Sequence, residues 1–254
     1  MKGVSAVVVA AGRGSRFKLK TTKILAPLAS RPLFVHCLRA LEAHPAIKEI
    51  ILVTSPENLK KVSAAVKKCR LQKVARVIKG GRRRQDSVYQ GLKATSLGSD
   101  LILIHDAARP FLNKEIISRA VGLAQRTGSA VAAVPVRGTI KTVKGQRSKV
   151  KGQRIVAKTL ERRLLWEAQT PQVFKRDLIL TAFRRFVRSN VTDDAALVEK
   201  LGKRVSIVMG ADSNIKITTQ EDLIIAEAIA KQLAGRQPAS GREPRPLGRG
   251  GSTI

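Results

Sequence analysis

A glycine-containing turn near the N-terminus carries the groups best suited to binding phosphate. Gly12 and Gly14 let backbone amides approach phosphate oxygens without side-chain obstruction. Arg16 and Lys23 add positive charge to the same turn. A dinucleotide-binding fingerprint would need a third glycine where Phe17 stands, and no Walker sequence follows. The spacing alone leaves two interpretations, a phosphate site of another type or an ordinary glycine turn with solvated basic side chains.

Asp106 is the acidic group best placed to act beside that turn. It follows the apolar run 101–104, so we expect it at the carboxyl end of a strand, where open α/β sheets bind their ligands. A carboxylate there could hold Mg²⁺ against a triphosphate, and Arg109 could bind a phosphate through two hydrogen bonds. The alternative is a surface turn in which Asp106 and Arg109 form an ion pair. We expect His105 to pack or to orient its neighbours rather than to act in catalysis.

Two further segments carry groups suited to an anionic ligand. Gly80 and Gly81 precede a helix start, whose free backbone amides could face a phosphate or a base carbonyl. The three arginines that follow, 82–84, are otherwise typical of a solvated face. Lys216 stands between two isoleucines in a short expected strand, 214–218, so its side chain lies opposite theirs. It is expected either at an exposed edge or reaching into the active cleft.

The elements that must position these groups follow from an alternation of two hydrophobic patterns. Continuous apolar runs, typical of strands buried in a parallel sheet, occupy residues 4–10, 50–53, 74–78, 101–104 and 130–134. Segments of helical length lie between them at 32–43, 56–69, 84–96 and 114–126. Ser55, Asn113 and Thr219 are suited to begin helices, the last one reaching about Gln232. The alternation predicts one α/β domain with a mostly parallel sheet.

Two segments break this pattern. From Arg137 to Arg163 the chain is strongly basic, contains several glycines and has Glu161 as its only acid. This composition predicts an extended arm or hairpin that leaves the sheet. Residues 234–254 are rich in Gly, Pro, Arg and Ser without apolar periodicity, so we expect a disordered basic tail.

The charge of the chain is strongly positive, with 49 Lys and Arg against 18 Asp and Glu, a net +31. A polyanionic partner is expected, either nucleic acid, a nucleotide or a phosphorylated metabolite. The basic residues are spread over the whole chain and aromatic residues are only 3%, so nucleic acid is not expected as the main partner. The apolar run 4–11 has the length of a signal-peptide core but ends in charged residues. We therefore expect a cytoplasmic protein without a membrane segment.

The order of these motifs resembles the 2-C-methyl-D-erythritol 4-phosphate cytidylyltransferase family. The glycine turn, Gly80-Gly81 with Ser87, and residues 105–110 come first, followed by the segments 135–141, 159–174, 192–194 and 214–222. The resemblance covers about residues 3 to 232. The chain departs from the family's pattern at Thr22 and Ile24, at Arg82 and at Gly138.

The resemblance implies a Rossmann-like three-layer sandwich with a mostly parallel sheet, formed by a nucleotidyltransferase domain of residues 1–233. An extended β-arm, 137–160, would join two copies into a homodimer. The implied reaction transfers CMP from CTP to 2-C-methyl-D-erythritol 4-phosphate in the non-mevalonate isoprenoid pathway. Two alternatives remain: transfer to another polyol phosphate such as ribitol 5-phosphate, or a basic nucleic-acid-binding protein that has kept this fold.

The resemblance also implies a role for each matching residue. The catalytic cations would be Arg16, Lys23, Arg162 and Lys216. The nucleotide would be bound by Ala10, Ala11, Gly12, Gly14, Gly81, Ser87, Asp106 and Ala107, with Gly81 and Ser87 reading the cytosine. Asp106 would hold Mg²⁺. The acceptor would be bound by Arg109, Thr139, Lys141, Thr170 and Thr192, some of them from the partner's arm.

Overall fold

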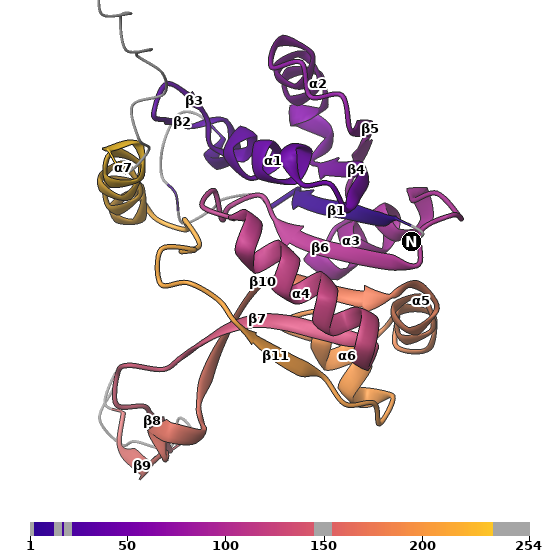
Figure 1. Ribbon diagram of the computed structural model, residues 1–254. Coiled ribbons are helices and arrows are strands. Elements are labelled where there is room, and N and C mark those ends of the chain that lie inside the picture. The colour runs from indigo at the N-terminus through magenta and orange to yellow at the C-terminus, as the bar shows by residue number, and fades with distance from the viewer. Residues whose placement is uncertain (1–2, 13–16, 18–21, 145–153, 236–254) are drawn as a thin grey trace, which may run out of the picture.

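The central feature of the fold is a seven-stranded sheet with strand order β11-β7-β10-β6-β1-β4-β5 (Figure 1). The computed structural model describes residues 3–12, 17, 22–144 and 154–235. The strands of the sheet are β1 (Val4–Ala10), β4 (Ile47–Thr54), β5 (Val74–Lys79), β6 (Leu101–Asp106), β7 (Ser129–Pro135), β10 (Trp166–Lys175) and β11 (Ser206–Met209). Only β10 runs antiparallel to its neighbours, β6 and β7. The predicted mostly parallel sheet is confirmed.

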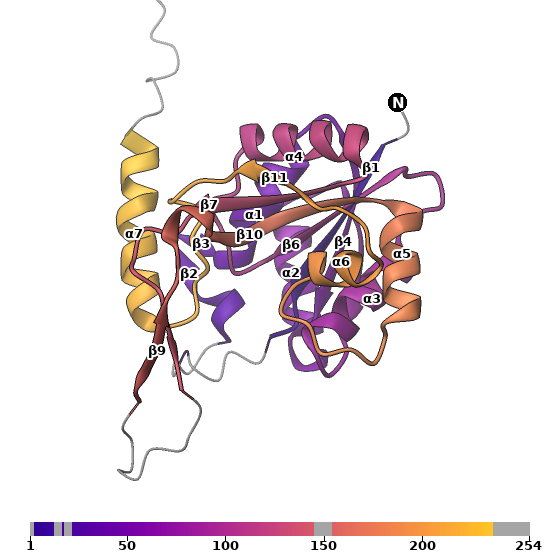
Figure 2. The same ribbon diagram turned by 90° about the horizontal axis from the view of Figure 1, so that it is seen from below.

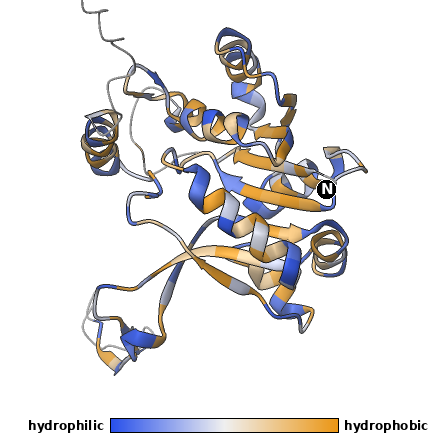
Figure 3. Ribbon diagram, in the orientation of Figure 1, coloured by the Kyte–Doolittle hydropathy of each residue, from blue (hydrophilic) through white to orange (hydrophobic). Residues whose placement is uncertain are grey.

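Helices cover both faces of this sheet (Figure 2). They are α1 (Leu33–Ala43), α2 (Leu59–Lys68), α3 (Arg84–Ala94), α4 (Lys114–Thr127), α5 (Arg176–Arg185), α6 (Ala195–Lys200) and α7 (Gln220–Gly235). One core cluster joins the sheet to α1, α2 and α4, and a second joins it to α3, α5 and α6. Along β1, Ala6 and Val8 belong to the first cluster and Val7 to the second, as the alternation of a strand requires. Figure 3 shows the resulting apolar interior of the sheet. The three-layer sandwich is thereby confirmed.

The connection between β5 and β6 creates the place where a ligand can bind. From β1 the chain passes to β4 and β5 on one side, then returns through α3 to β6 on the other side of β1. Such a reversal of direction leaves a crevice at the carboxyl ends of the two central strands. The loops after β1, β5 and β6 all end at this crevice, and these loops carry the motifs singled out in the sequence.

The predicted elements are confirmed with differences at their ends. The helix expected over 56–69 begins as a short 3-10 turn, Pro56–Asn58, and continues as α2. Asn113 caps α4, because its Oδ1 accepts from the backbone N–H of Ile116 at 2.9 Å. Ser55 is the N-cap residue of the 3-10 turn and Pro56 its first residue, as expected, although the Ser55 side chain makes no capping hydrogen bond. Helix α7 runs to Gly235, three residues beyond the expected Gln232.

The basic segment forms a two-stranded antiparallel hairpin away from the sheet. Strand β8 (Lys141–Val143) pairs with β9 (Val156–Thr159). In Figures 1 and 2 this arm and α7 project on the same side of the molecule. The tip of the arm and the expected tail beyond residue 235 lie outside the described residues. The extended β-arm of the predicted fold is confirmed.

No helix in the described part of the chain is long and apolar enough to cross a membrane.

Helix α3 packs against the sheet so closely that one of its glycines has no room for a side chain. A Cβ at Gly91 would overlap Val7 Cγ1 of β1 and meet Val53 of β4. We therefore expect Gly91→Ala to lower the free energy of unfolding by about 1–3 kcal/mol, the cost of overpacking a core. Gly122 in α4 is the matched control, because a Cβ there meets nothing closer than 3.8 Å. Gly122→Ala should raise the free energy of unfolding by up to about 1 kcal/mol. Urea unfolding measures both, and equal effects of the two substitutions would contradict this account.

Candidate active site

A cleft of about 580 Å³ opens at the carboxyl ends of the central strands. Its wall combines small residues after β1, the loop after β5, the end of β6 and two lysines from elsewhere in the chain. The predicted site residues that line it are Ala10, Ala11, Gly12, Lys23, Gly81, Ser87, Asp106 and Lys216. Ala107 is buried directly beside them, with its backbone N–H bonded to Val9 O at 3.0 Å. Residues separated by up to about two hundred positions in sequence thus meet in one cavity, whereas Gly14 and Arg16 lie outside the described residues.

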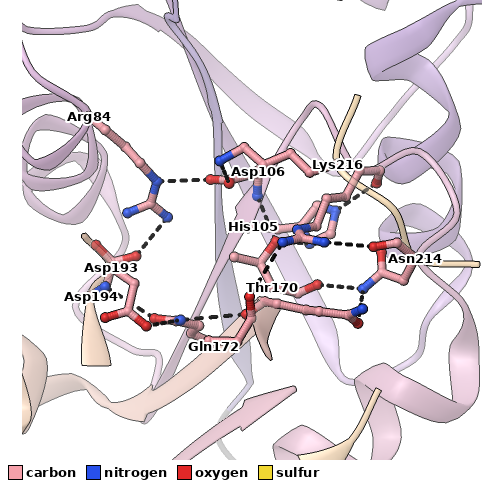
Figure 4. Close-up of polar contacts among 12 residues, drawn as sticks. Arg84, His105, Asp106, Thr170, Gln172, Asp193, Asp194, Asn214 and Lys216 are labelled. Carbon is pink, nitrogen blue, oxygen red and sulfur yellow. Dashed lines mark hydrogen bonds and ion pairs between the residues drawn. The ribbon is translucent and has the colours of Figure 1, made fainter. Parts of the chain in front are cut away.

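Asp106 is the charged centre of the cleft. Its Oδ1 lies 2.9 Å from Arg84 Nε, and its Oδ2 lies 2.6 Å from Lys216 Nζ (Figure 4). The side chain is only 9% exposed. Burial alone would raise the pKa of this carboxyl, but the cations of Arg84 and Lys216 hold that pKa well below its ordinary value. Asp106 is therefore ionised at any physiological pH.

Arg84 was not among the predicted site residues. Its guanidinium joins Asp106 to Asp194, with Nη2 lying 2.9 Å from Asp194 Oδ2. Arg83, by contrast, folds back on Asp86 at the start of α3. The three consecutive arginines cannot be told apart in the sequence. The role of Arg84 differs from that of Arg83 only because the fold brings Asp106 and Asp194 to Arg84. The sequence feature that could have indicated an arginine at the site is the pair Asp193-Asp194, which lies in a segment already matched to the family.

A chain of hydrogen bonds through Thr170 and His105 fixes the backbone of Asp106. The backbone N–H of Asp106 donates to Thr170 Oγ1 at 3.1 Å. His105 Nε2 lies 3.0 Å from Arg109 O, which can only accept, so the Nε2 nitrogen carries the proton. The Thr170 hydroxyl then donates to His105 Nδ1 at 3.0 Å. His105 is fully buried and acts as an orienting group, as expected from the sequence.

Arg109 does not pair with Asp106, so the ion pair considered as an alternative is not formed. Its Nη1 donates to Asn214 O at 2.7 Å and its Nη2 approaches Ala168 O at 3.5 Å. Its Nε has no hydrogen-bond partner among the described residues, although the side chain is buried. Burial lowers the pKa of Arg109, but an arginine remains charged in proteins. The structure thus keeps a buried cation with spare hydrogen-bonding capacity below the cleft.

The buried state of His105 makes the stability of the protein sensitive to acid. Burial lowers the pKa of His105 from 6.5 to about 4. Between these values the unfolded chain binds a proton that the folded chain does not, so the free energy of unfolding falls as the pH falls. We expect a loss of up to about 1.4 kcal/mol per pH unit from this group. Urea unfolding of wild type and His105→Gln at pH 7, 6 and 5 measures it. The variant should lose less stability on acidification, and equal losses would contradict the assignment.

The loop after β5 is built from two glycines and a serine. Gly80 N–H donates to Thr54 O at 2.7 Å, and Gly81 N–H donates to Ser87 Oγ at 3.1 Å. The Ser87 hydroxyl can itself donate to Arg83 O at 3.1 Å. A Cβ at Gly80 would come within 2.6 Å of Ala11 Cβ, so a glycine is needed where this loop meets the turn after β1. The Ser87 hydroxyl therefore holds the Gly81 amide in the wall of the cleft.

Several predicted acceptor-binding residues lie away from this cleft. Thr139 and Lys141 belong to the arm and Arg162 to the 3-10 turn after it (Arg162–Leu164), and none of the three is among the described residues that line the cavity. Lys141 Nζ bonds to Thr159 Oγ1 at 2.6 Å, and Arg162 Nη1 donates to Arg137 O at 3.0 Å. Thr192 is exposed beside the buried Asp194. In the part of the chain that the structure describes, these three side chains do not reach the cleft.

The segment 214–218 is not a strand, which corrects that expectation. The backbone N–H of Ile217 donates to Ala108 O at 2.9 Å, and the side chain of Ile217 is buried. Lys216 nevertheless points to Asp106, so it reaches the cleft rather than an exposed edge. The irregular segment 214–218 thus brings Lys216 to the cleft, which the expected strand was one way to achieve.

The donor set fits a magnesium ion that is held mainly by a nucleotide. Among the described residues no group of three or more His, Cys, Asp or Glu side chains could hold a metal ion. Mg²⁺ is usually bound through one or two carboxylates together with substrate phosphates and water. Asp106, which is ionised and lines the cleft, is a carboxylate of this kind, and its Oδ2 is paired with Lys216.

Comparison with known proteins identifies close relatives. The family described as IspD: 2-C-methyl-D-erythritol 4-phosphate cytidylyltransferase matches residues 4–232. A 2-C-methyl-D-erythritol 4-phosphate cytidylyltransferase of Pelotomaculum thermopropionicum is 44% identical over 245 residues, which make up 95% of this chain and 100% of that one. A bifunctional enzyme IspD/IspF of Desulfotalea psychrophila is 40% identical over 232 residues, which make up 91% of this chain and 58% of that longer enzyme. The structure of 4-diphosphocytidyl-2C-methyl-D-erythritol synthase from Anaerococcus prevotii matches with a TM-score of 0.78 and 29% identity, covering 91% of this chain and 96% of that one.

Proposed function

Because the chain belongs to the 2-C-methyl-D-erythritol 4-phosphate cytidylyltransferase family, we propose that it transfers CMP from CTP to 2-C-methyl-D-erythritol 4-phosphate. The predicted family and the predicted class of enzyme, a nucleotidyltransferase, are confirmed. The observation that carries the proposal is the meeting of Lys23, Asp106 and Lys216 in one cleft at the reversal point of the sheet. Cations in that position suit a triphosphate beyond the ends of the strands.

The chemistry needs positioning more than acid–base catalysis. The acceptor phosphate is already an anionic nucleophile, so no general base has to remove a proton. Its oxygen forms a bond to the α-phosphorus of CTP while the bond from that phosphorus to the bridging oxygen of the β-phosphate breaks, and pyrophosphate leaves in line. Two mutually repelling anions must be held together, and charge at the α-phosphate must be neutralised.

The cations of the cleft would perform these tasks. Lys23 and Arg16 would hold the triphosphate, and Lys216 would bind the α-phosphate where charge develops. Ala10, Ala11, Gly12, Gly14 and Ala107 would contact the nucleotide, and Gly81 with Ser87 would frame the cytosine. Mg²⁺ bound by Asp106 and phosphate oxygens would supply further neutralisation of the triphosphate. Lys216 then has to exchange one anionic partner, Asp106, for another, the nucleotide.

A homodimer would bring the acceptor-binding residues to the cleft. The arm and the 3-10 turn after it carry exposed apolar side chains, including Val156 at 52% and Leu164 at 71% exposure. Such side chains on a projecting hairpin are typical of a surface that another protein covers. Placed against a second copy, the arm would present Thr139, Lys141 and Arg162 to the partner's cleft, beside Arg109, Thr170 and Thr192 of that copy. We propose that the enzyme works as this dimer in the cytoplasm, in isoprenoid precursor synthesis.

A pyrophosphate-release assay tests the reaction. We expect turnover with CTP, Mg²⁺ and 2-C-methyl-D-erythritol 4-phosphate, and little with UTP or ATP. Ribitol 5-phosphate as the acceptor separates the first alternative, because preferred turnover with it would reassign the substrate. Tight duplex binding at about 200 mM salt without CTP turnover would favour the nucleic-acid alternative, since purely electrostatic binding weakens steeply with salt.

A further inference from the structure

Arg84 differs from the other cation on Asp106 in that both sides of its guanidinium are fixed. Its Nε lies 2.9 Å from Asp106 Oδ1 and its Nη2 lies 2.9 Å from Asp194 Oδ2 (Figure 4). The side chain of Asp194 is only 2% exposed. A planar guanidinium held between two carboxylates has little freedom to leave either one.

The anchor of Arg84 is itself tied to the core of the sheet. Gln172 of β10, which is 1% exposed, accepts from the backbone N–H of Asp194 at 3.2 Å and of Ala195 at 3.1 Å through its Oε1. Its Nε2 donates to Asp193 Oδ2 at 2.8 Å. One buried glutamine thus fixes both aspartates at the start of α6, and through Asp194 it fixes Arg84.

Lys216 has none of this support. Its side chain is 40% exposed, its ion pair with Asp106 joins a single oxygen, and it stands on an irregular segment. An ammonium on a flexible stem is a point charge that can change partners readily. The two bonds on Asp106 therefore differ in kind, one fixed and one exchangeable.

We propose that Arg84 is a positioning residue, which keeps Asp106 in place and neutralised while Lys216 moves to the nucleotide. This inference rests on the proposed cytidylyl transfer. Without Arg84, the departure of Lys216 would leave the buried carboxylate of Asp106 with no protein cation beside it, which is strongly unfavourable. With Arg84 in place, Lys216 can leave, and Asp106 Oδ2 becomes available to the magnesium ion that accompanies the triphosphate.

A double-mutant cycle tests this division of labour. Arg84→Lys keeps the positive charge but loses the fork. We expect kcat to fall by about 10²-fold, as a misplacement of about 1 Å near a reacting centre can cause. In an Asp106→Asn background the same substitution should change kcat by less than about threefold, because Arg84 acts through Asp106. Calorimetric titration with CTP and Mg²⁺, without acceptor, should show binding weakened by about tenfold in Arg84→Lys.

Arg176→Lys provides the matched control. Arg176 is the first residue of α5, and its Nη1 donates to Thr95 Oγ1 at 2.7 Å and to Ser96 O at 2.9 Å, beyond the far end of α3. Its substitution also removes a guanidinium that bridges two acceptors, and should leave both kcat and the binding of CTP unchanged. If Arg84→Lys shows no cooperative melting, Asp194→Asn replaces it in the cycle, with a smaller loss of kcat expected in the same background-dependent way.

Two results would overturn the inference: wild-type kcat and binding in the Arg84 variant, or an equal loss of kcat in both backgrounds. Absence of pyrophosphate release from the wild-type enzyme would overturn the proposed function instead. In that case the calorimetric comparison still tests whether Arg84 supports binding of CTP with Mg²⁺.

Discussion

Lys216→Ala is expected to lower kcat by about 10²–10³-fold, the loss typical of removing one group that stabilises charge in a transition state. Its ammonium lies 2.6 Å from Asp106 Oδ2 and lines the cleft, within reach of a bound triphosphate. The protein should remain folded, because the side chain is 40% exposed and Asp106 keeps its bond to Arg84. Steady-state pyrophosphate release and thermal melting measure the two quantities.

A second lysine serves as the control for this substitution. Lys73 Nζ donates to His44 O at 2.9 Å, and its side chain is also only partly exposed. It is not among the residues that line the cleft, so Lys73→Ala should leave kcat unchanged. A raised KM for CTP with unchanged kcat in Lys216→Ala would show that Lys216 binds the ground state only, and would contradict its proposed role at the α-phosphate.

The parallel part of the sheet could be predicted because its strands are buried on both faces. Strand β1 is apolar except for Ser5, and β6 is apolar up to His105 and Asp106 at its end. The antiparallel strand β10 carries no such signal. Glu167, Gln169, Thr170 and Gln172 interrupt it, because several of its side chains hold Asp106, Asp194 and the segment before Lys216 instead of filling the core. A buried strand whose polar side chains support a site therefore lacks the apolar pattern of a strand that only packs in the core.

Site residues could be predicted where they belong to a local sequence motif. Those whose role depends on tertiary contacts could not be predicted. The glycines after β5 and the aspartate after β6 stand at strand ends, so their place followed from the elements. The role of Arg84 depends on Asp194, which is 110 residues away. The prediction of a strand at 214–218 was wrong for a similar reason. The segment alternates as a strand does, but Asn214 O accepts from the side chain of Arg109 instead of from a neighbouring strand.

The arm bears on the proposed homodimer. Thr139, Lys141 and Arg162 were carried over by resemblance to an acceptor site, yet in this chain they lie on or beside a hairpin whose apolar side chains face solvent. A closed two-fold dimer would make each arm reach the other copy, so that each cleft combines residues of both chains. A site shared between two chains predicts a recovery of activity in mixed dimers, which a site within one chain does not.

Mixed dimers of two inactive variants are expected to regain activity. Arg162→Ala should lower kcat/KM by about 10²-fold, because a guanidinium that binds the acceptor phosphate is lost. Lys216→Ala is inactive for the separate reason given above. In a mixed dimer, the cleft of the Arg162→Ala chain keeps its own Lys216 and receives an intact arm from the Lys216→Ala chain. The other cleft lacks both side chains, so one cleft of each mixed dimer is complete.

The size of the recovery follows from this geometry. Random association makes about half of the dimers mixed, so co-refolded variants should show about one quarter of the wild-type rate. Mixed dimers isolated through two different affinity tags should show about half of it. If each arm served its own cleft, every cleft in the mixture would lack one cation and no recovery would appear. A mixture of Lys216→Ala with Lys23→Ala is the control, because both substitutions affect the same cleft of each chain. In that mixture every cleft lacks one of the two lysines, and the rate should stay at the level of the separate variants.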